Sequence, residues 1–419
     1  MTRIAFFGPL PPSNTGIADY DEALLPLLRK DLTVDVFLSG APSGGEGFSH
    51  ADFFLRHQKQ PYDLTLYQLG NSPFHEYMYG YLFQNPGAVI FHDYCLLHSR
   101  SEMLLKKKMT REYRDELAAV YPQQAEEIAN AIIPSAAGNL LFYQFPLFEL
   151  VLRSSLAAAA HTDFAVKKLS TTETPVIKIP HLELGAGTAS GYGLLPGKFV
   201  IGSFGYATNA KRISTLLDVV AGIRTEHPEV ICSVVGEVED PAEMHRRIQT
   251  LGLQDCVIVT GHVGMPDFLA WMGRVDVVVN LRYPSAGEMS GTLIRALASA
   301  KPVIISRLPA LLEIPEDTVL RVRPDREKED LKNALAALVK DGALRARLSA
   351  NARKYIREHH SPEMARAQYR KLIDAALERK STFRGIELPS HLKSEKEILR
   401  DYLRRTSFEK LSSHLFYPF

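Results

Sequence analysis

Several features that would define a secreted, metal-rich or membrane-spanning protein are lacking in this sequence. Its three cysteines (Cys95, Cys232 and Cys256) are scattered over 419 residues without a CxxC pair. We therefore expect buried free thiols rather than disulfides or metal ligands. No apolar run approaches the ~18 residues that a membrane-spanning helix needs. Met1 leads directly into a strand-like apolar segment without a charged leader, so we expect a cytoplasmic protein.

An excess of charge of one sign is also absent. The 49 Lys and Arg residues balance 48 Asp and Glu residues. Global charge therefore does not favour a nucleic-acid partner, and any recognition of phosphate has to be local. Hydrophobic residues make up 46% of the chain and charged residues 23%, which is typical of a globular protein with an ample core. The length suits two domains.

Short apolar runs alternate with helical periodicity through most of the chain. Candidate strands are residues 4–7, 34–38, 64–67, 89–91 and 156–160, then 199–203, 230–235, 257–259, 275–280 and 303–306. Candidate helices include 18–30, 213–224, 242–251, 266–272 and 292–300. Continuously apolar strands separated by helices are typical of parallel sheets covered on both faces. We predict an α/β fold with two doubly wound, Rossmann-like parallel-sheet domains.

The glycine-rich stretch 184–193 divides the two alternating series and is the best linker candidate. After about residue 325 the pattern is helical only, at 330–340, 344–359 and 362–379. We predict an N-terminal domain at 1–185, a linker at 186–193 and a C-terminal domain at 194–375. A helical tail at 376–419 would pack back on the N-terminal domain.

Residues directly after strands are the candidate ligand contacts, because doubly wound sheets bind ligands at the carboxyl ends of their strands. Gly16 opens a helix where a diphosphate or sugar could approach the backbone, although a stiff proline-rich turn is the alternative. Asn71 and His75 follow the third strand and are candidates for the acceptor or sugar side. His92 follows the fourth and could bind a ligand hydroxyl or satisfy neighbouring groups. Asp93 would point to the opposite face, so we expect no metal site.

In the second half, Gly205 follows a strand, and Lys211 and Arg212 begin the next helix. Cations at a helix N-terminus oppose its macrodipole unless an anion lies between them. The pair therefore indicates a phosphate site, with a solvated helix face as the alternative.

The segment 280–298 holds the densest set of candidates. Arg282 follows a strand and is a further candidate for the sugar or acceptor side. Ser290, Gly291 and Thr292 open a helix whose N–H groups and hydroxyls suit an anion. Glu288 would repel a phosphate, so it fits sugar hydroxyls, or it caps the helix.

In this order, the pieces resemble the retaining GT-B glycosyltransferases of family four, the glycosyltransferase group 1 type. They are the Pro-rich loop with Gly16, a histidine after an N-domain strand, AAAAHTDFAVKKL at 157–169, the Gly205…Lys211 loop, TGHV at 260–263, and Glu288 before a helix followed by KPVI at 301–304. The resemblance covers most of the chain. It implies two domains facing a cleft and metal-independent transfer of a sugar from a nucleotide diphosphate with retained configuration, without a cofactor.

The resemblance also implies roles for single residues. Lys211, helped by Arg212, would clamp the pyrophosphate, while Ser290, Gly291 and Thr292 would meet the distal phosphate. Gly261 and His262 would lie beside the nucleobase, and Gly16 and Gly205 would allow close approach. Glu288 would bind the donor sugar, and His92 would lie near it from the other domain. The expected catalytic residues are therefore His92, Glu288 and Lys211.

Two positions depart from the family pattern. Tyr206 stands where an arginine usually follows the glycine of the phosphate loop, and Arg295 stands in place of a second, ribose-binding carboxylate. These departures keep open a non-catalytic nucleotide-sugar or glycan-binding protein of the same fold. A sugar-nucleotide epimerase is a further alternative. A Rossmann oxidoreductase is disfavoured because the GxGxxG fingerprint is absent.

The acceptor stays open among a glycan, a lipid-linked sugar and a small molecule, in bacterial surface-polysaccharide or glycoconjugate synthesis. Lys106, Lys107 and Lys108 beside apolar residues 103–105 could form a basic amphipathic patch on anionic lipid. Such a patch would place the protein peripherally at the inner membrane face. A solvated helix face is the alternative.

Overall fold

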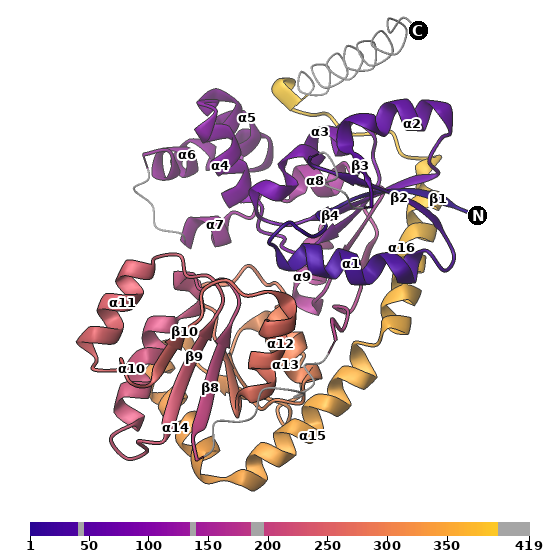
Figure 1. Cartoon of the computed structure of the whole chain (residues 1–419). Helices are drawn as coiled ribbons and strands as arrows, with labels where there is room; N and C mark the ends of the chain where they lie inside the picture. Colours follow the sequence, from indigo (N-terminus) through magenta and orange to yellow (C-terminus); the bar gives the residue numbers. More distant parts are fainter. Residues whose placement is uncertain (41–45, 135–139, 186–196, 393–419) are drawn as a thin grey trace, which may run out of the picture. The chain divides into compact units, whose positions relative to one another are not determined.

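A computed structural model describes residues 1–40, 46–134, 140–185 and 197–392 of the chain. Contacts divide the chain into two compact units (Figure 1). Unit 1 comprises Met1–Pro180 together with Ala365–Phe419, and unit 2 comprises His181–Met364. Residues 365–375, which the sequence placed in the C-terminal domain, therefore belong to unit 1. The predicted linker, 186–193, lies outside the described residues.

Unit 1 is built on a seven-stranded sheet in the order β3-β2-β1-β4-β5-β6-β7, and every neighbouring pair is parallel. The strands are β1 Arg3–Phe7, β2 Thr33–Leu38, β3 Phe48–Ser49, β4 Leu64–Leu69, β5 Ala88–Phe91, β6 Ala157–Ala160 and β7 Val176–Lys178. The helices are α1 Gly16–Leu28, α2 Phe53–Lys59, α3 Glu76–Gln84, α4 Leu97–Lys106, α5 Thr110–Val120, α6 Ala125–Ile132, α7 Leu140–Gln144, α8 Glu149–Arg153 and α9 Asp163–Leu169, with 3₁₀ turns η1 His50–Asp52 and η2 Pro73–His75.

Unit 2 contains a six-stranded parallel sheet in the order β10-β9-β8-β11-β12-β13. Its strands are β8 Phe199–Phe204, β9 Val230–Val235, β10 Val257–Val259, β11 Val277–Asn280, β12 Val303–Ser306 and β13 Leu320–Val322. Its helices are α10 Ile213–Ile223, α11 Pro241–Thr250, α12 Met265–Arg274, α13 Gly291–Ala298, α14 Glu327–Lys340 and α15 Gly342–His359, with 3₁₀ turns η3 Asn209–Lys211, η4 Pro309–Leu311 and η5 Pro324–Arg326. The predicted α/β fold with two doubly wound parallel sheets is confirmed.

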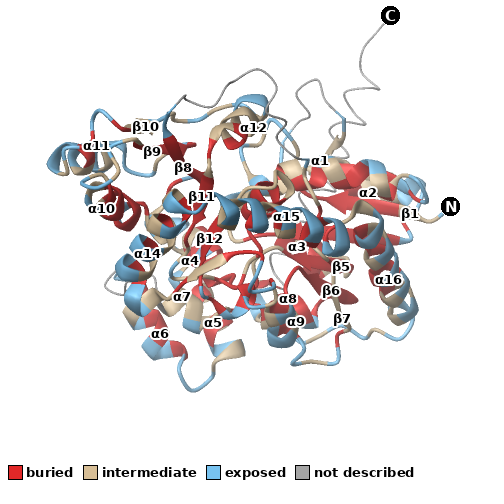
Figure 2. Cartoon of the chain, turned by 90° about the horizontal axis from the view of Figure 1, so that it is seen from below, coloured by how far each residue is buried: buried red, intermediate tan, exposed pale blue. Residues whose placement is uncertain are grey.

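Helices cover both faces of the unit 2 sheet, which explains its continuously apolar strands (Figure 2). Val277 and Val279 of β11 pack with residues of α10 and α14, whereas Val278 between them packs with residues of α12, α13 and α15. Successive side chains of a strand point to opposite faces of the sheet. Both sets of side chains are therefore covered by helices, and both are apolar. Each fully buried side chain of this kind contributes roughly 1.5–3 kcal/mol.

The last described helix, α16 (Pro362–Lys380), starts in unit 2 and continues in unit 1. Within unit 1, the Tyr369 hydroxyl lies 3.1 Å from that of Tyr20 on α1, and Gln68 of β4 donates to it at 3.3 Å. Farther along the chain, His391 lies 2.9 Å from the buried carboxylate of Glu116 on α5. The described part of the predicted tail therefore packs within unit 1.

Candidate functional site

The carboxyl ends of β8 and β11 mark the point where the strand order of unit 2 reverses. The loops that follow these two strands touch, because the backbone N–H of Tyr283 donates to the carbonyl of Ala210 at 2.8 Å. Doubly wound sheets bind their ligands at this switch point. Most of the candidates from the second half of the sequence lie on these two loops.

Two glycines keep the switch point open. Gly205 has a φ of +83°, and a Cβ there would lie 2.7 Å from Lys211 Nζ and 3.3 Å from Thr292 Oγ1. Gly236, with a φ of +129°, packs on Gly205 so closely that a Cβ would lie 2.8 Å from the Gly205 backbone. An ammonium and a hydroxyl therefore converge over bare backbone, which is the geometry of an anion site. Sequence analysis missed Gly236, although it directly follows the β9 strand as Gly205 follows β8.

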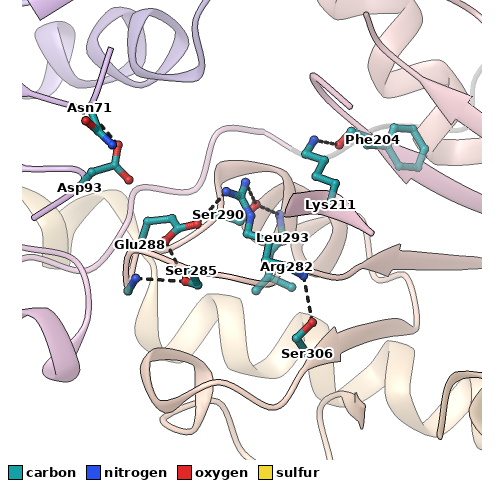
Figure 3. Close-up of polar contacts among 11 residues, drawn as sticks. Asn71, Asp93, Phe204, Lys211, Arg282, Ser285, Glu288, Ser290, Leu293 and Ser306 are labelled. Carbon is teal, nitrogen blue, oxygen red and sulfur yellow. Dashed lines mark hydrogen bonds and ion pairs between the residues drawn. The ribbon is translucent and has the colours of Figure 1, made fainter. Parts of the chain in front are cut away.

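Lys211 ends η3 and turns its ammonium toward the sheet, where it donates to the carbonyl of Phe204 (Figure 3). Burial lowers the pKa of Lys211 well below its ordinary value, and the nearby charge of Arg282 lowers it further. Among the described residues, no carboxylate pairs with this ammonium. A desolvated cation without a counter-ion is costly, so the site favours an anionic ligand.

Arg282 and Glu288 form an ion pair on the loop after β11 (Figure 3). One terminal nitrogen of Arg282 donates to Glu288 Oε1 at 2.7 Å, and the other lies 3.5 Å from Ser290 Oγ. The second oxygen of Glu288 accepts from Ser285 Oγ at 2.9 Å. Glu288 therefore does not cap α13, and both of its oxygens are engaged within the loop.

Helix α13 begins at the same place. Ser290 is its N-cap, and its hydroxyl accepts from the N–H of Leu293 at 3.4 Å. The N–H groups of Gly291 and Thr292 belong to the first turn, where a helix supplies no backbone acceptor. Ser290, Gly291 and Thr292 therefore present a helix N-terminus beside Lys211 and Arg282, as predicted. Neither Arg295, which donates to the Leu184 carbonyl at 2.7 Å, nor the following Ala296 offers a ribose-binding carboxylate.

Gly261 and His262 lie on the neighbouring loop after β10. Gly261 has a φ of +68° and pairs with Gly236 in an isolated bridge, and Thr260 Oγ1 accepts from the N–H of Gly236 at 3.2 Å. His262 is exposed. These contacts join the β10 loop to the glycines of the switch point, so both residues lie on its rim. Their contact with a nucleobase stays a prediction.

Arg212 points away from this site. It adopts a left-handed conformation, with a φ of +59°, and its Nε bonds both oxygens of the buried Glu327 at 2.9 and 3.1 Å. Thr215 donates to the same carboxylate at 2.6 Å. The sequence predicted an anion near Lys211 and Arg212, and for Arg212 this anion is the carboxylate of Glu327. Glu327 engages the Nε of Arg212, and help from Arg212 in clamping a phosphate stays a prediction.

In unit 1, His92 lies at the carboxyl end of β5, as the sequence predicted. Its Nε2 lies 2.7 Å from Gln68 Oε1 and its Nδ1 lies 3.2 Å from His161 Nε2. The ring of Tyr20 packs edge-on against it. Both ring nitrogens thus have partners inside unit 1, so a sugar hydroxyl would have to replace one of them. The donor-sugar role of His92 stays a prediction.

Two other candidates of unit 1 serve local structure. His75 is fully buried, its Nδ1 lies 2.9 Å from the Gln68 carbonyl, and burial lowers its pKa to about 4. Asn71 Oδ1 accepts from the N–H of Ser99 at 2.9 Å, which ties the β4 loop to α4. The acceptor-side roles predicted for these two side chains do not fit these contacts. Gly16 is the exposed first residue of α1, with open space where a Cβ would lie, so a ligand can approach it.

Unit 1 also holds a cavity of about 480 Å³ at the carboxyl ends of β1 and β2, which sequence analysis did not find. It lies between the loop after β1, helix α1, the end of β2 and two aromatic residues, Phe74 and Tyr77. Three charged residues line it: Glu22, Arg29 and Glu46. Arg29 already pairs with Glu46 at 2.7 Å, so the lining carries a net negative charge.

Among the described residues, no group of three or more His, Cys, Asp or Glu side chains is arranged to hold a metal ion. No helix in the same ranges combines the length and apolar character needed to cross a membrane. The three cysteines are buried free thiols, as expected.

Residues 191–355 match the family model described as "Glycosyl transferases group 1". A curated relative, an uncharacterized glycosyltransferase of Methanocaldococcus jannaschii called MJ1069, is 23% identical over 147 residues. That alignment covers 35% of this chain and 37% of the relative, so only about a third of its length is matched.

Two solved structures resemble the whole chain. Sucrose-phosphate synthase of Thermosynechococcus elongatus is 18% identical with a TM-score of 0.61, covering 90% of this chain and 100% of the other. HepE of Anabaena, solved in complex with UDP, is 15% identical with a TM-score of 0.54 and the same coverage. At these identities the likeness shows the shared fold, and it confirms the GT-B architecture.

Proposed function

We propose that this chain, whose second unit belongs to the group 1 glycosyltransferases, is a glycosyltransferase that takes its sugar from a nucleoside diphosphate donor. The observation that supports this proposal most is the anion site at the switch point of unit 2. There the ammonium of Lys211 and the hydroxyl of Thr292 converge over Gly205 beside the N-terminus of α13. A diphosphate supplies the negative charge that this arrangement lacks.

The same site explains how transfer would be accelerated. Negative charge develops on the diphosphate as the bond to the sugar breaks, and donors held at that position stabilise it. Lys211 and the first N–H groups of α13 are held by the fold, so they need no reorganisation during the reaction. We propose that the leaving group is stabilised in this way without a metal ion. The acceptor hydroxyl would then attack from the face that the leaving group vacates, which retains the configuration.

The donor that we propose to test first is a UDP-sugar, because HepE, which shares the fold, was solved in complex with UDP. A thermal-shift screen with UDP, GDP and ADP identifies the nucleotide. A ligand at a hundredfold excess over its Kd stabilises the folded state by about 2.7 kcal/mol. If none of the three raises the melting temperature, the proposed donor site is wrong.

Catalysis is distinguished from binding alone by the release of the nucleoside diphosphate. A transferase releases it from the sugar nucleotide in a manner that depends on the acceptor, whereas an epimerase needs no acceptor. A non-catalytic binding protein is the second candidate, because both oxygens of Glu288 are engaged within the protein and no second carboxylate follows it. Binding of a sugar nucleotide without any release of the diphosphate would favour that candidate.

For the acceptor we propose a neutral glycan bound at the unit 1 cavity. Phe74 is 41% exposed there and offers an apolar face to a sugar ring, while Glu22 and Glu46 can accept hydrogen bonds from hydroxyls. The net negative lining disfavours an acceptor that carries phosphate. Phe74→Ala should raise the KM for the acceptor several-fold and leave the KM for the donor unchanged. Equal kinetics for neutral and phosphorylated acceptors would contradict this assignment.

A role in bacterial surface-polysaccharide or glycoconjugate synthesis within the cytoplasm, at the inner membrane face, fits this reaction and is part of the proposal. The apolar half of the predicted basic patch, however, is buried: Met103 and Leu104 pack in the core of α4–α6. Lys106 pairs with Glu102, and Lys107 lies 3.9 Å from Glu76. Any contact with anionic lipid would therefore act through charge alone. Co-sedimentation with anionic vesicles that disappears in 0.5 M salt would support it.

A further inference from the structure

The side chain of Arg282 has more hydrogen-bonding capacity than its visible partners use. It lies on the loop after β11, and its backbone is fixed by Ser306, whose hydroxyl accepts from the Arg282 N–H at 2.9 Å (Figure 3). Its two terminal nitrogens contact Glu288 at 2.7 Å and Ser290 at 3.5 Å. Its Nε is buried and has no hydrogen-bond partner in the part of the chain that the structure describes. A guanidinium offers five N–H donors, so several remain for a ligand.

The loop of Arg282 is also tied to the loop of Lys211. The Tyr283 N–H donates to the Ala210 carbonyl, so the residues next to these two cations are hydrogen-bonded to each other. Glu288 is the one carboxylate paired with Arg282, and Lys211 has none, among the described residues. Two cations thus share one anion at the N-terminus of α13, which itself carries about half a positive charge. With Lys211 protonated, the positive charge exceeds the negative charge, and a bound phosphate would favour that protonated form.

We propose that Arg282 is the second cation of the donor-diphosphate site and that Glu288 is a positioning residue that holds its guanidinium there. The inference rests on the proposed function and replaces the sugar-side roles that the sequence suggested for both residues. Arg282 binds a phosphate through the remaining N–H donors of its terminal nitrogens, opposite the Lys211 ammonium. Glu288 fixes the guanidinium from the other side through Oε1, while Ser285 orients the carboxylate through Oε2.

The alternative is that the ion pair between Arg282 and Glu288 only stabilises the loop. Titration with UDP distinguishes this structural role from phosphate binding by Arg282. Arg282→Ala should raise the Kd for UDP about 10- to 100-fold, because charge-assisted hydrogen bonds are lost. The Kd for uridine, which has no phosphate, should not change. Arg224→Ala is the matched control. It removes an arginine that pairs with Asp255 at 2.7 Å and that lies between α10 and the amino end of β9, away from the carboxyl ends of the strands. That control should bind UDP as the wild type does.

Relocation of the arginine gives a second, independent test. Tyr206 directly follows Gly205, and its side chain is 51% exposed at the same site. Introducing Tyr206→Arg into the Arg282→Ala variant should return the Kd for UDP to within about fivefold of wild type. UDP affinity as weak in the double variant as in Arg282→Ala would mean that Arg282 acts through the loop, and would overturn the proposal. An unchanged Kd in Arg282→Ala would overturn it as well.

The role of Glu288 is tested by comparing two ligands. Glu288→Gln keeps the hydrogen bond with Ser285 but weakens the hold on Arg282. If Glu288 positions Arg282, the affinities for UDP and for UDP-glucose should fall by the same factor, about 3- to 10-fold. If only UDP-glucose binds more weakly, Glu288 contacts the sugar and the positioning role is wrong. Failure of the wild-type protein to bind any nucleoside diphosphate would instead reject the proposed function, before any variant is compared.

Discussion

Both units place polar side chains at the carboxyl ends of their strands, but the hydrogen-bond partners of these side chains differ. In unit 1, His92 is bonded to Gln68 and His161, and Asn71 is bonded to Ser99. In unit 2, as far as the described residues show, Lys211 donates only to a carbonyl oxygen, and Arg282 has a buried nitrogen without a partner. Buried polar groups are usually satisfied, so the two basic side chains at the switch point of unit 2 suit an anionic ligand. Among the described residues, unit 1 also has buried polar atoms without a partner, such as both carboxylate oxygens of Asp21, but these would not attract an anion. The comparison supports the proposal that unit 2 binds the anionic part of the donor.

The largest expected effect is that of Lys211→Ala. The variant should lose transfer by about 100- to 1,000-fold, because one preorganised donor to the leaving group is removed. Its melting temperature should not fall, since the ammonium is desolvated and has no carboxylate partner among the described residues. Released nucleoside diphosphate and thermal unfolding measure the two outcomes. Unchanged turnover at saturating donor and acceptor would contradict the proposal that unit 2, and not unit 1, binds the diphosphate.

His92→Ala tests the other side of the comparison. The substitution removes the hydrogen bonds that His92 makes with Gln68 Oε1 and His161 Nε2, which should destabilise the fold by about 2 kcal/mol. Urea unfolding measures this loss, and kcat and KM measured at a temperature where the variant is folded report on any catalytic role. A large fall in kcat without loss of stability would show that unit 1 also supplies a reacting group.

The pH dependence of stability should reveal His75. Burial lowers its pKa in the folded state from 6.5 to about 4, so the unfolded chain binds a proton first as the pH falls. Stability is full above pH 6.5 and is lost as the pH drops toward 4. Between pH 7.5 and 5, His75 should lower the free energy of unfolding by about 2 kcal/mol. His75→Gln should flatten this part of the curve in urea titrations, and an unchanged slope would exclude His75 as its source.

The smallest effect concerns Asp21 on α1. Both carboxylate oxygens are buried without a hydrogen-bond partner among residues 1–40, 46–134, 140–185 and 197–392, and burial raises the pKa of this carboxyl well above its ordinary value. The folded state therefore loses stability as the pH rises above about 4. Asp21→Asn should raise the melting temperature at pH 7 by about 2–4 °C. No gain, or a loss, would indicate that the carboxyl has a partner in solution.

Much of the fold could be predicted because its strands are long apolar runs. Strands such as β9 and β12 were predicted with their observed bounds. The short strands β3, β7 and β13 were missed, because two or three residues, all but Val322 only partly buried, give no periodic signal. Each of these strands lies at an edge of its sheet, where one neighbour is enough.

The site was less predictable, because its contacts join distant positions. Lys211 and the start of α13 follow strands, so their location at the carboxyl edge could be predicted. The sequence could not predict which of the two adjacent cations lies at the switch point, because the partner of Arg212 is Glu327, 115 positions away. The pairing of His92 with His161 likewise joins two strands that are separated by the inserted helices α4–α8.

The nesting of unit 2 within unit 1 has a consequence for biosynthesis. Unit 2 is one continuous stretch, so it can complete its fold while the chain is still growing on the ribosome. Unit 1 cannot, because Tyr369 of α16 must return to Tyr20 and Gln68, more than 300 positions upstream. Until α16 is synthesised, the contacts of Tyr369 with Tyr20 and Gln68 cannot form. A truncated chain that ends before α16 would therefore carry every strand of unit 2 but an incomplete unit 1.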